Sequence, residues 1–169
     1  MDYKKLIRDI PDYPVKGVIF KDLTTLWKNR ESFHKSIDEL IDMIKHIDFE
    51  KVLSMEARGF IIGSVISYKL KKGFVPVRKK GKLPYKTVSY EYELEYGKDQ
   101  IFIHEDAIEK NEKILIVDDL LATGGTTNAA IELVKKLNGI PVGAAYLVEL
   151  SFLEGRKKVN IPIYSLIKY

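Results

Sequence analysis

The residues best suited to chemistry form one run, in which two adjacent carboxylates precede a turn rich in threonine and glycine. Asp118 and Asp119 follow the apolar run 113–117, and the turn at 122–126 reads Ala-Thr-Gly-Gly-Thr and opens a helix. Glycine lets backbone N–H groups approach an anion closely, and the amino end of a helix carries partial positive charge. The turn therefore suits a phosphate. The carboxylates would repel a phosphate, so they suit the hydroxyls of an attached sugar, with a divalent cation nearby.

This run matches neither of the common nucleotide-binding motifs. No Gly-Lys-Ser/Thr follows the glycines, so it is not a Walker A loop, and it lacks the Gly-x-Gly-x-x-Gly spacing of dinucleotide-binding folds. An acidic pair or a glycine pair alone would indicate an exposed turn with a helix cap. The whole run, placed after a buried strand, favours a sugar-phosphate site.

Three other segments carry residue types that could complete such a site. Arg58 bears a permanent charge that matches phosphate oxygens, although it could also be a surface charge at the start of a helix. The basic cluster Arg78-Lys79-Lys80-Gly81-Lys82 is either a solvated loop or a loop that faces a polyanionic substrate. The apolar run 18–20 either fills a core or offers Phe20 for stacking on a flat ring.

The elements that must position these residues alternate between strand and helix. Apolar runs predict strands over 51–55, 74–77, 113–117 and 142–150. Apolar side chains at intervals of three and four predict helices over 31–47, 60–70 and 126–137. Period-two patterning around Gly97 predicts a hairpin or a long mobile loop with strand-forming ends. The alternation predicts an α/β fold with a parallel sheet, whose ligand site lies beyond the strand ends at Met55 and Val117.

Length and composition exclude several classes of protein. The chain of 169 residues predicts one domain, and the absence of cysteine excludes disulfide scaffolds, thiolate metal sites and cysteine nucleophiles. The three histidines lack metal-ligand spacing. A net charge of +4, with basic and acidic side chains interleaved, is modest for a nucleic-acid-binding protein. Without a signal-peptide pattern, and with no apolar stretch longer than 60–68, we expect a cytoplasmic protein that contacts no membrane.

The run from Val117 to Thr126 resembles the phosphoribosyl-pyrophosphate motif of the type I phosphoribosyltransferases, and the resemblance extends over essentially the whole chain. It implies a central, mostly parallel sheet flanked by helices, in one domain over 1–169. A small hood at about 1–30 and a flexible catalytic loop at about 81–97 complete the implied fold. The resemblance assigns the ribose 2′- and 3′-hydroxyls to Asp118 and Asp119. It assigns the 5′-phosphate to Leu121, Ala122, Thr123, Gly124, Gly125 and Thr126.

The same resemblance assigns the other two substrate groups. Pyrophosphate contacts are implied for Glu56, Ala57, Arg58, Lys79 and Lys82, with strained backbone donors in the first three. In the hood, Phe20 would stack on a purine ring, while backbone groups of Ile19 and Lys21 would bond the 6-amino group and N1. A 6-oxo purine presents the reverse pattern and would leave two buried groups mispaired, at a cost of about 1–3 kcal/mol each.

The implied catalytic residues are Arg58 and a Glu-Tyr pair at the end of the flexible loop. Glu95 is our candidate general acid/base near N7 of the base, and Tyr96 would help to exclude water. Alternation of Glu91, Glu93 and Glu95 would by itself indicate only the polar face of a strand. The assignment therefore depends on the resemblance, which at this point is to adenine-specific members of the family.

We therefore expect a purine-salvage enzyme that transfers the phosphoribosyl group of 5-phosphoribosyl 1-pyrophosphate to N9 of adenine, forming AMP and pyrophosphate. Mg²⁺ is the implied cofactor, held through substrate and water with no direct protein ligand, and a homodimer is the implied assembly. Two alternatives stay open. One is the same reaction on a 6-oxo purine. The other is a phosphoribosyl-pyrophosphate-binding regulator that contacts nucleic acid, which an isoelectric point near 9.0 favours and the lack of a separate basic domain disfavours.

Overall fold

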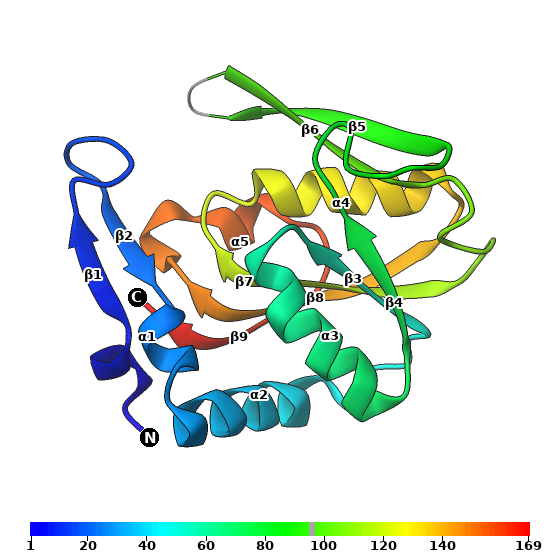
Figure 1. The fold of residues 1–169 in the computed structure, drawn as a ribbon. Helices are drawn as coiled ribbons and strands as arrows, with labels where there is room; N and C mark the ends of the chain where they lie inside the picture. Colours follow the sequence, from blue (N-terminus) through cyan, green and yellow to red (C-terminus); the bar gives the residue numbers. More distant parts are fainter. Residues whose placement is uncertain (95–96) are drawn as a thin grey trace.

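The computed structural model describes residues 1–94 and 97–169, and its centre is a five-stranded parallel sheet (Figure 1). The strands lie in the order β4-β3-β7-β8-β9. Their bounds are β3 Lys51–Met55, β4 Gly73–Val77, β7 Lys113–Leu121, β8 Ile140–Glu149 and β9 Ile163–Lys168. The chain runs outward from β3 to β4 and then returns to place β7 on the other side of β3. Adjacent strands at such a reversal diverge at their carboxyl ends, which is where open α/β sheets bind ligands.

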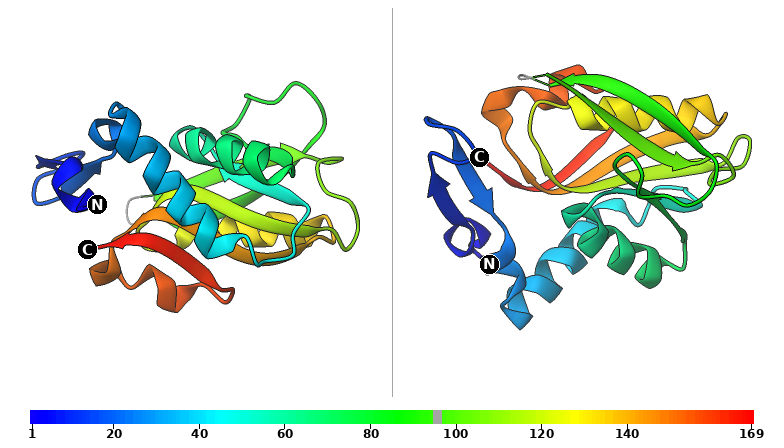
Figure 2. Two further views of the ribbon diagram at one scale, coloured as in Figure 1. Left: turned by 90° about the horizontal axis from the view of Figure 1, so that it is seen from below. Right: turned by 45° about the horizontal axis from the view of Figure 1, so that its top comes forward.

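Helices cover both faces of the sheet, as the two views in Figure 2 show. The helices α2 (Arg30–Ile44) and α3 (Arg58–Leu70) pack on one face, and α4 (Gly125–Lys136) packs on the other. Along β7, Leu115 and Val117 belong to the first core and Ile114 and Ile116 to the second, because successive side chains of a strand point to opposite faces. The unbroken apolar run is thus explained by burial on both sides.

A small antiparallel ribbon lies beyond the carboxyl ends of the sheet strands, next to the end of β9 (Figures 1 and 2). It consists of β1 (Arg8–Pro11) and β2 (Ile19–Asp22), preceded by a 3₁₀ turn and followed by the short helix α1 (Thr24–Trp27). These elements fall within the segment 1–30 expected to form a hood.

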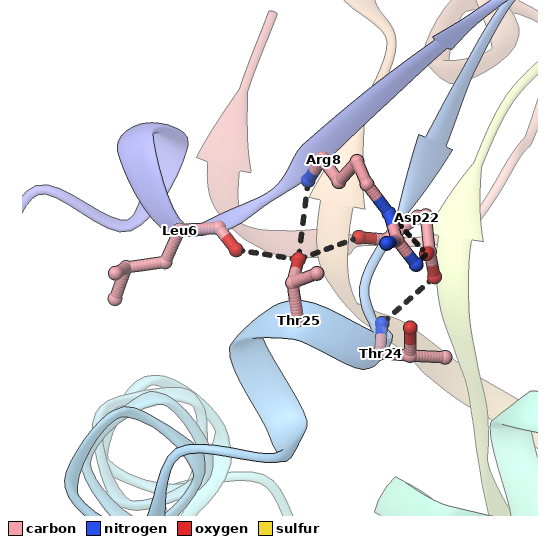
Figure 3. A network of polar contacts seen from close by, with 5 residues as sticks. All are labelled: Leu6, Arg8, Asp22, Thr24 and Thr25. Atoms are coloured by element: carbon pink, nitrogen blue, oxygen red, sulfur yellow. Dashed lines mark hydrogen bonds and ion pairs between the residues drawn. The ribbon is translucent and has the colours of Figure 1, made fainter.

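One polar network anchors this ribbon to the helix that follows it (Figure 3). The Asp22 carboxylate accepts bonds from the Arg8 guanidinium at 2.5 and 3.0 Å and from the Thr24 N–H at 3.0 Å. Thr25 Oγ1 donates to the Leu6 carbonyl at 2.7 Å. The hydrogen bond from Arg8, more than any other contact, lowers the pKa of Asp22 to about 2. Asp22 is therefore ionised at neutral pH, and its charge holds the ribbon in place.

A second antiparallel pair, β5 (Thr87–Leu94) and β6 (Gly97–His104), packs against the outer side of α4 (Figure 1). The strand-forming ends expected from period-two patterning are therefore paired with each other in the residues described. After β8, the chain makes a 3₁₀ turn, Ser151–Leu153, and the short helix α5 (Gly155–Lys158) before it enters β9. Within the described ranges, no helix is long and apolar enough to cross a membrane.

The predicted fold class is confirmed, with every pairing in the central sheet parallel. The largest boundary error is at the end of one strand. The strand expected to stop at Val117 continues to Leu121, since β7 pairs with β8 as far as Leu121 and Glu149. Asp118 and Asp119 therefore lie on the last part of a strand and not in a turn. Their polarity hid the continuation, because apolar runs mark only the buried part of a strand.

Candidate active site

Arg58 and the acidic pair meet where β3 and β7 diverge. Arg58 is the first residue of α3, immediately beyond β3, and Asp119 lies on β7. Arg58 Nε is 2.9 Å from Asp119 Oδ2, an ion pair in which the carboxylate is almost fully buried. This contact does not have the alignment of a hydrogen bond. Among the described residues, Asp119 Oδ2 is thus a buried acceptor without a hydrogen bond. Buried polar atoms are usually hydrogen-bonded, so a ligand donor is the expected partner of this oxygen.

The two adjacent, buried carboxylates disfavour further negative charge at the site. Burial raises the pKa of Asp118, and the charge of Asp119 raises it further, to well above its usual range. Burial also raises the pKa of Asp119, although the Arg58 guanidinium opposes that rise. The Asp118 carboxylate accepts the N–H of Asp119 at 2.8 Å, which fixes its orientation. Hydroxyl donors would relieve the unmet hydrogen bonding of such a pair, whereas another anion would not.

The glycine-rich turn lies beyond the end of β7, and α4 begins within it. Gly124 has a φ of 84°, a left-handed conformation that costs a side-chain-bearing residue energy. A hollow of about 70 Å³ is lined by Asp118 and residues 120–127. The backbone N–H groups at the start of α4 have no earlier carbonyls to bond within the helix, so this hollow offers donors and a helix dipole to an anion.

Two later segments of the chain, β8 and α5, pack closely against the turn and support it. The Thr127 and Tyr146 hydroxyls are 2.6 Å apart and both are buried, which ties the first turn of α4 to β8. On the other side, Gly155 of α5 lies so close that an added Cβ would be 2.1 Å from the Ala122 carbonyl oxygen. The conformation of the turn therefore depends on residues that are distant in sequence.

The N-terminal ribbon closes one side of the site. The Arg58 guanidinium lies 5.0 Å from the centre of the Phe20 ring, and the Tyr13 ring packs edge-on against the same ring at 5.2 Å. The ribbon also borders a largely apolar pocket of about 650 Å³, whose lining includes neither Phe20 nor Arg58. It is lined by Gly17, Val18, Ile19, Lys21, Ala122, Thr123, Leu150, Phe152, Leu153 and Tyr169. A flat heterocycle is the kind of ligand that such walls accept.

The basic segment approaches from the end of β4 and is held by a carboxylate. Glu56 Oε2 accepts the Lys79 N–H and Arg78 Nε, both at 2.8 Å. The Lys79 N–H, more than any other contact, lowers the pKa of Glu56, despite opposition from burial. The Glu56 side chain therefore points toward the basic segment and orients it. The peptide bond between Glu56 and Ala57 is cis, and the side chain of Lys82 is exposed.

The structure thus brings most of the predicted residues to one edge of the sheet. Arg58 touches both Asp119 and Phe20, and the hood residues Ile19 and Lys21 share a pocket with the turn. Glu95 and Tyr96 lie outside the described residues, so their assignment stays a prediction.

Sequence reasoning missed Leu150, Phe152 and Tyr169 as pocket residues and Tyr146 as a support for the turn. Leu150 directly follows β8 and Tyr169 directly follows β9, so the rule that ligands bind at strand ends could have found both. Phe152 and Tyr146 have no such signal in the sequence.

Comparisons with known proteins agree with this geometry. A family model described as "Phosphoribosyl transferase domain" matches residues 27–168. The adenine phosphoribosyltransferases of Thermotoga petrophila and Brachyspira hyodysenteriae are 57% and 53% identical, each over the full length of both chains. The crystal structure of the enzyme from Thermoanaerobacter pseudethanolicus superimposes with a TM-score of 0.97 at 50% identity, covering 99% of this chain and 98% of the other. The enzyme from Saccharomyces cerevisiae, complexed with adenine and an imino-altritol bisphosphate, has a TM-score of 0.90 at 37% identity and coverages of 98% and 96%.

The fold, the acidic pair and the phosphate-sized turn at the sheet edge therefore define a phosphoribosyltransferase. Within that class, relatives more than half identical over their whole length narrow the assignment further. The chain belongs to the adenine phosphoribosyltransferase family.

Proposed function

We propose that the protein transfers the phosphoribosyl group of 5-phosphoribosyl 1-pyrophosphate to N9 of adenine, giving AMP and pyrophosphate. The observation that supports this most strongly is the position of Arg58, whose side chain contacts both the acidic pair and the aromatic ring of the hood. One site at that point can hold a sugar between a purine and an anionic leaving group. Breaking the bond at ribose C1′ would leave oxocarbenium character, which a site closed to water must tolerate.

The sugar phosphate would bind across β7 and the turn. Asp118 and Asp119 would accept hydrogen bonds from the ribose 2′- and 3′-hydroxyls, because Asp119 Oδ2 lacks a hydrogen bond. Such donors would also offset the burial that raises the pKa values of both carboxyls. The 5′-phosphate would occupy the hollow at 120–127, where backbone N–H groups and the dipole of α4 favour an anion.

The pyrophosphate would lie between the start of α3 and the basic segment. Arg58 would move from Asp119 toward the phosphate oxygens, with the backbone of Glu56 and Ala57 and the side chains of Lys79 and Lys82 completing the contacts. The Glu56 carboxylate would repel pyrophosphate, so we assign its side chain to orienting Lys79.

Magnesium fits this site as a companion of the substrate. An acidic pair beside an anion-binding segment suits a divalent cation that bridges substrate oxygens, and its charge would offset that of the leaving group. Among residues 1–94 and 97–169, no three His, Asp or Glu side chains are grouped to hold a metal ion. We propose that substrate and water carry Mg²⁺, with the acidic pair close by.

Adenine would bind on the side of the hood where Phe20 meets Arg58, with its ring stacked on Phe20. Backbone groups of Ile19 and Lys21 would bond the 6-amino group and N1. Glu95, as acid/base near N7, and Tyr96, as a barrier to water, belong to the sequence that joins β5 to β6. Closure of the loop 81–97 would bring them to the base.

The test is release of pyrophosphate from phosphoribosyl pyrophosphate with Mg²⁺, measured separately with adenine, hypoxanthine, guanine and xanthine. We expect release with adenine and background rates with the 6-oxo purines. Release with a 6-oxo purine alone would keep the chemistry and refute our assignment of Ile19 and Lys21. Tight binding of phosphoribosyl pyrophosphate without release with any base would instead favour a regulator, and a gel shift at physiological salt would then test nucleic-acid binding.

Two variants test individual roles. If the double change Asp118→Ala and Asp119→Ala left the affinity for phosphoribosyl pyrophosphate unchanged, the ribose assignment would be refuted. A Glu95→Gln variant with unchanged turnover would do the same for the acid/base role. We also propose a homodimer in the cytoplasm; light scattering of the purified protein tests the assembly.

A further inference from the structure

Lys79, which our proposed function assigns to pyrophosphate, already has an anionic partner within the chain. Its ammonium forms an ion pair with the Asp99 carboxylate on β6. Its backbone is held separately, by the N–H bond to Glu56. The side chain of Lys79 can therefore exchange partners while its main chain stays at the edge of the site.

Asp99 also connects the hairpin to the phosphate-binding turn. The Tyr92 hydroxyl donates to Asp99 Oδ2 at 3.0 Å, and Thr126 Oγ1 donates to the Tyr92 hydroxyl at 3.4 Å. Lys79, Asp99, Tyr92 and Thr126 thus form one chain of contacts that leads from the basic segment to the first turn of α4. Two of the four, Lys79 and Thr126, are residues that we expect to contact substrate phosphates.

The Asp99 carboxylate is well placed to compete with a phosphate. Burial raises its pKa, but hydrogen bonds from Lys79, the Gln100 N–H and Tyr92 outweigh burial and hold the pKa below its usual range. Asp99 is therefore ionised at neutral pH. It offers Lys79 the same charged oxygen that a pyrophosphate would offer.

We propose that Asp99 is a positioning residue that competes with pyrophosphate for Lys79 and holds its side chain until substrate arrives. This inference rests on the proposed function. Binding of phosphoribosyl pyrophosphate then exchanges the Asp99 contact for a phosphate contact. Return of Lys79 to Asp99 assists release of the product pyrophosphate.

The test is the dissociation constant of Mg²⁺-pyrophosphate, measured by calorimetry for wild type and Asp99→Asn. Because the Lys79–Asp99 pair is partly exposed, we expect a tightening of about three- to fivefold in the variant. The KM for phosphoribosyl pyrophosphate falls by a similar factor, while the KM for adenine is unchanged. If Asp99 had a purely structural role, Asp99→Asn would instead weaken the binding of pyrophosphate, phosphoribosyl pyrophosphate and adenine together.

Glu91→Gln is the matched control, because Glu91 forms an exposed ion pair with Lys98 in the same hairpin and the charge change is the same. We expect it to alter pyrophosphate affinity less than twofold. In a Lys79→Gln background, Asp99→Asn has no further effect, since the competition no longer exists. Tyr92→Phe removes a donor to the Asp99 oxygen that pairs with Lys79 but leaves the Lys79–Asp99 pair in place. Pyrophosphate binding should therefore not tighten in this variant.

Equal or weaker pyrophosphate binding by a folded Asp99→Asn protein would overturn the proposal, as would the same gain in Glu91→Gln or in the Lys79→Gln background. If Asp99→Asn does not fold, Asp99→Ser replaces it, and equal or weaker pyrophosphate binding by that variant overturns the proposal. If the wild-type protein forms AMP but Asp99→Asn leaves the affinity for pyrophosphate unchanged, only this inference is refuted. Wild-type protein that binds no pyrophosphate would refute the proposed function as well.

Discussion

Gly59 is the position at which one added methyl group should damage the site most directly. It is the second residue of α3, buried against the strand that carries the acidic pair. A Cβ built on Gly59 would lie 2.7 Å from Asp118 Oδ1, 3.1 Å from Ser54 Oγ and 3.3 Å from Asp118 Cα. Because the last contact is to the backbone, rotation of the Asp118 side chain alone would not remove the crowding.

The size of the effect follows from these distances. Ordinary van der Waals contact begins at 3.4 Å, so Asp118 Oδ1 must move by about 0.7 Å. Overpacking of this kind costs about 1–3 kcal/mol of folding free energy. Misplacement of a substrate-binding group by about 1 Å can cost about 100-fold in rate. For Gly59→Ala we therefore expect kcat/KM for phosphoribosyl pyrophosphate to fall roughly 10- to 100-fold, which is about 1.4–2.7 kcal/mol of transition-state stabilisation.

The assay measures AMP formation at varied phosphoribosyl pyrophosphate concentration, together with urea unfolding. Gly63→Ala is the control, since its Cβ would lie 2.5 Å from Ser54 Oγ and 2.7 Å from Ser54 Cβ, one helical turn further from Asp118. It should lose stability to a similar extent and keep kcat/KM within about threefold. Our reasoning would be refuted if Gly59→Ala were destabilised but bound and turned over phosphoribosyl pyrophosphate normally, or if Gly63→Ala lost the same activity.

Three further changes probe other parts of the site. Asp118→Asn should weaken phosphoribosyl pyrophosphate binding yet raise the melting temperature at pH 8. Folding raises the pKa of Asp118, so the wild-type protein loses stability as the pH rises and this carboxyl ionises. The gain of Asp118→Asn over wild type should therefore vanish below about pH 4. Asp22→Asn should cost about 2 kcal/mol at pH 7 by removing the charged partner of Arg8. Because the folded pKa is lowered to about 2, urea unfolding should show this loss shrinking as pH falls below about 4. Gly155→Ala places a Cβ 2.1 Å from the Ala122 carbonyl oxygen, so its affinity for phosphoribosyl pyrophosphate should fall at least about 10-fold in a binding titration.

Local patterns in the sequence predicted most of the strands and helices of the central fold and one binding site. The apolar run 113–117 predicted a strand buried on both faces, and the spacing of apolar residues predicted α2 and α4 to within a few residues. The acidic pair and glycine-rich turn predicted a sugar-phosphate site, because carboxylates and glycine-rich helix starts have opposite preferences for charge. These features depend on the residue types and their spacing, so short segments were enough to recognise them.

The relations between distant segments were not predictable in this way. The packing of Gly155 against Ala122, the buried Thr127–Tyr146 contact, the Lys79–Asp99 ion pair and the Tyr92–Thr126 contact each join residues about 20 to 35 positions apart. No local periodicity encodes such pairs, because they arise only when the strands and helices pack together. The residue types and their spacing in the sequence thus predicted which residues bind each part of the substrate. Only the tertiary structure decided which side chains support the turn and which carboxylate pairs with Lys79, since both depend on packing between segments that are far apart in the chain.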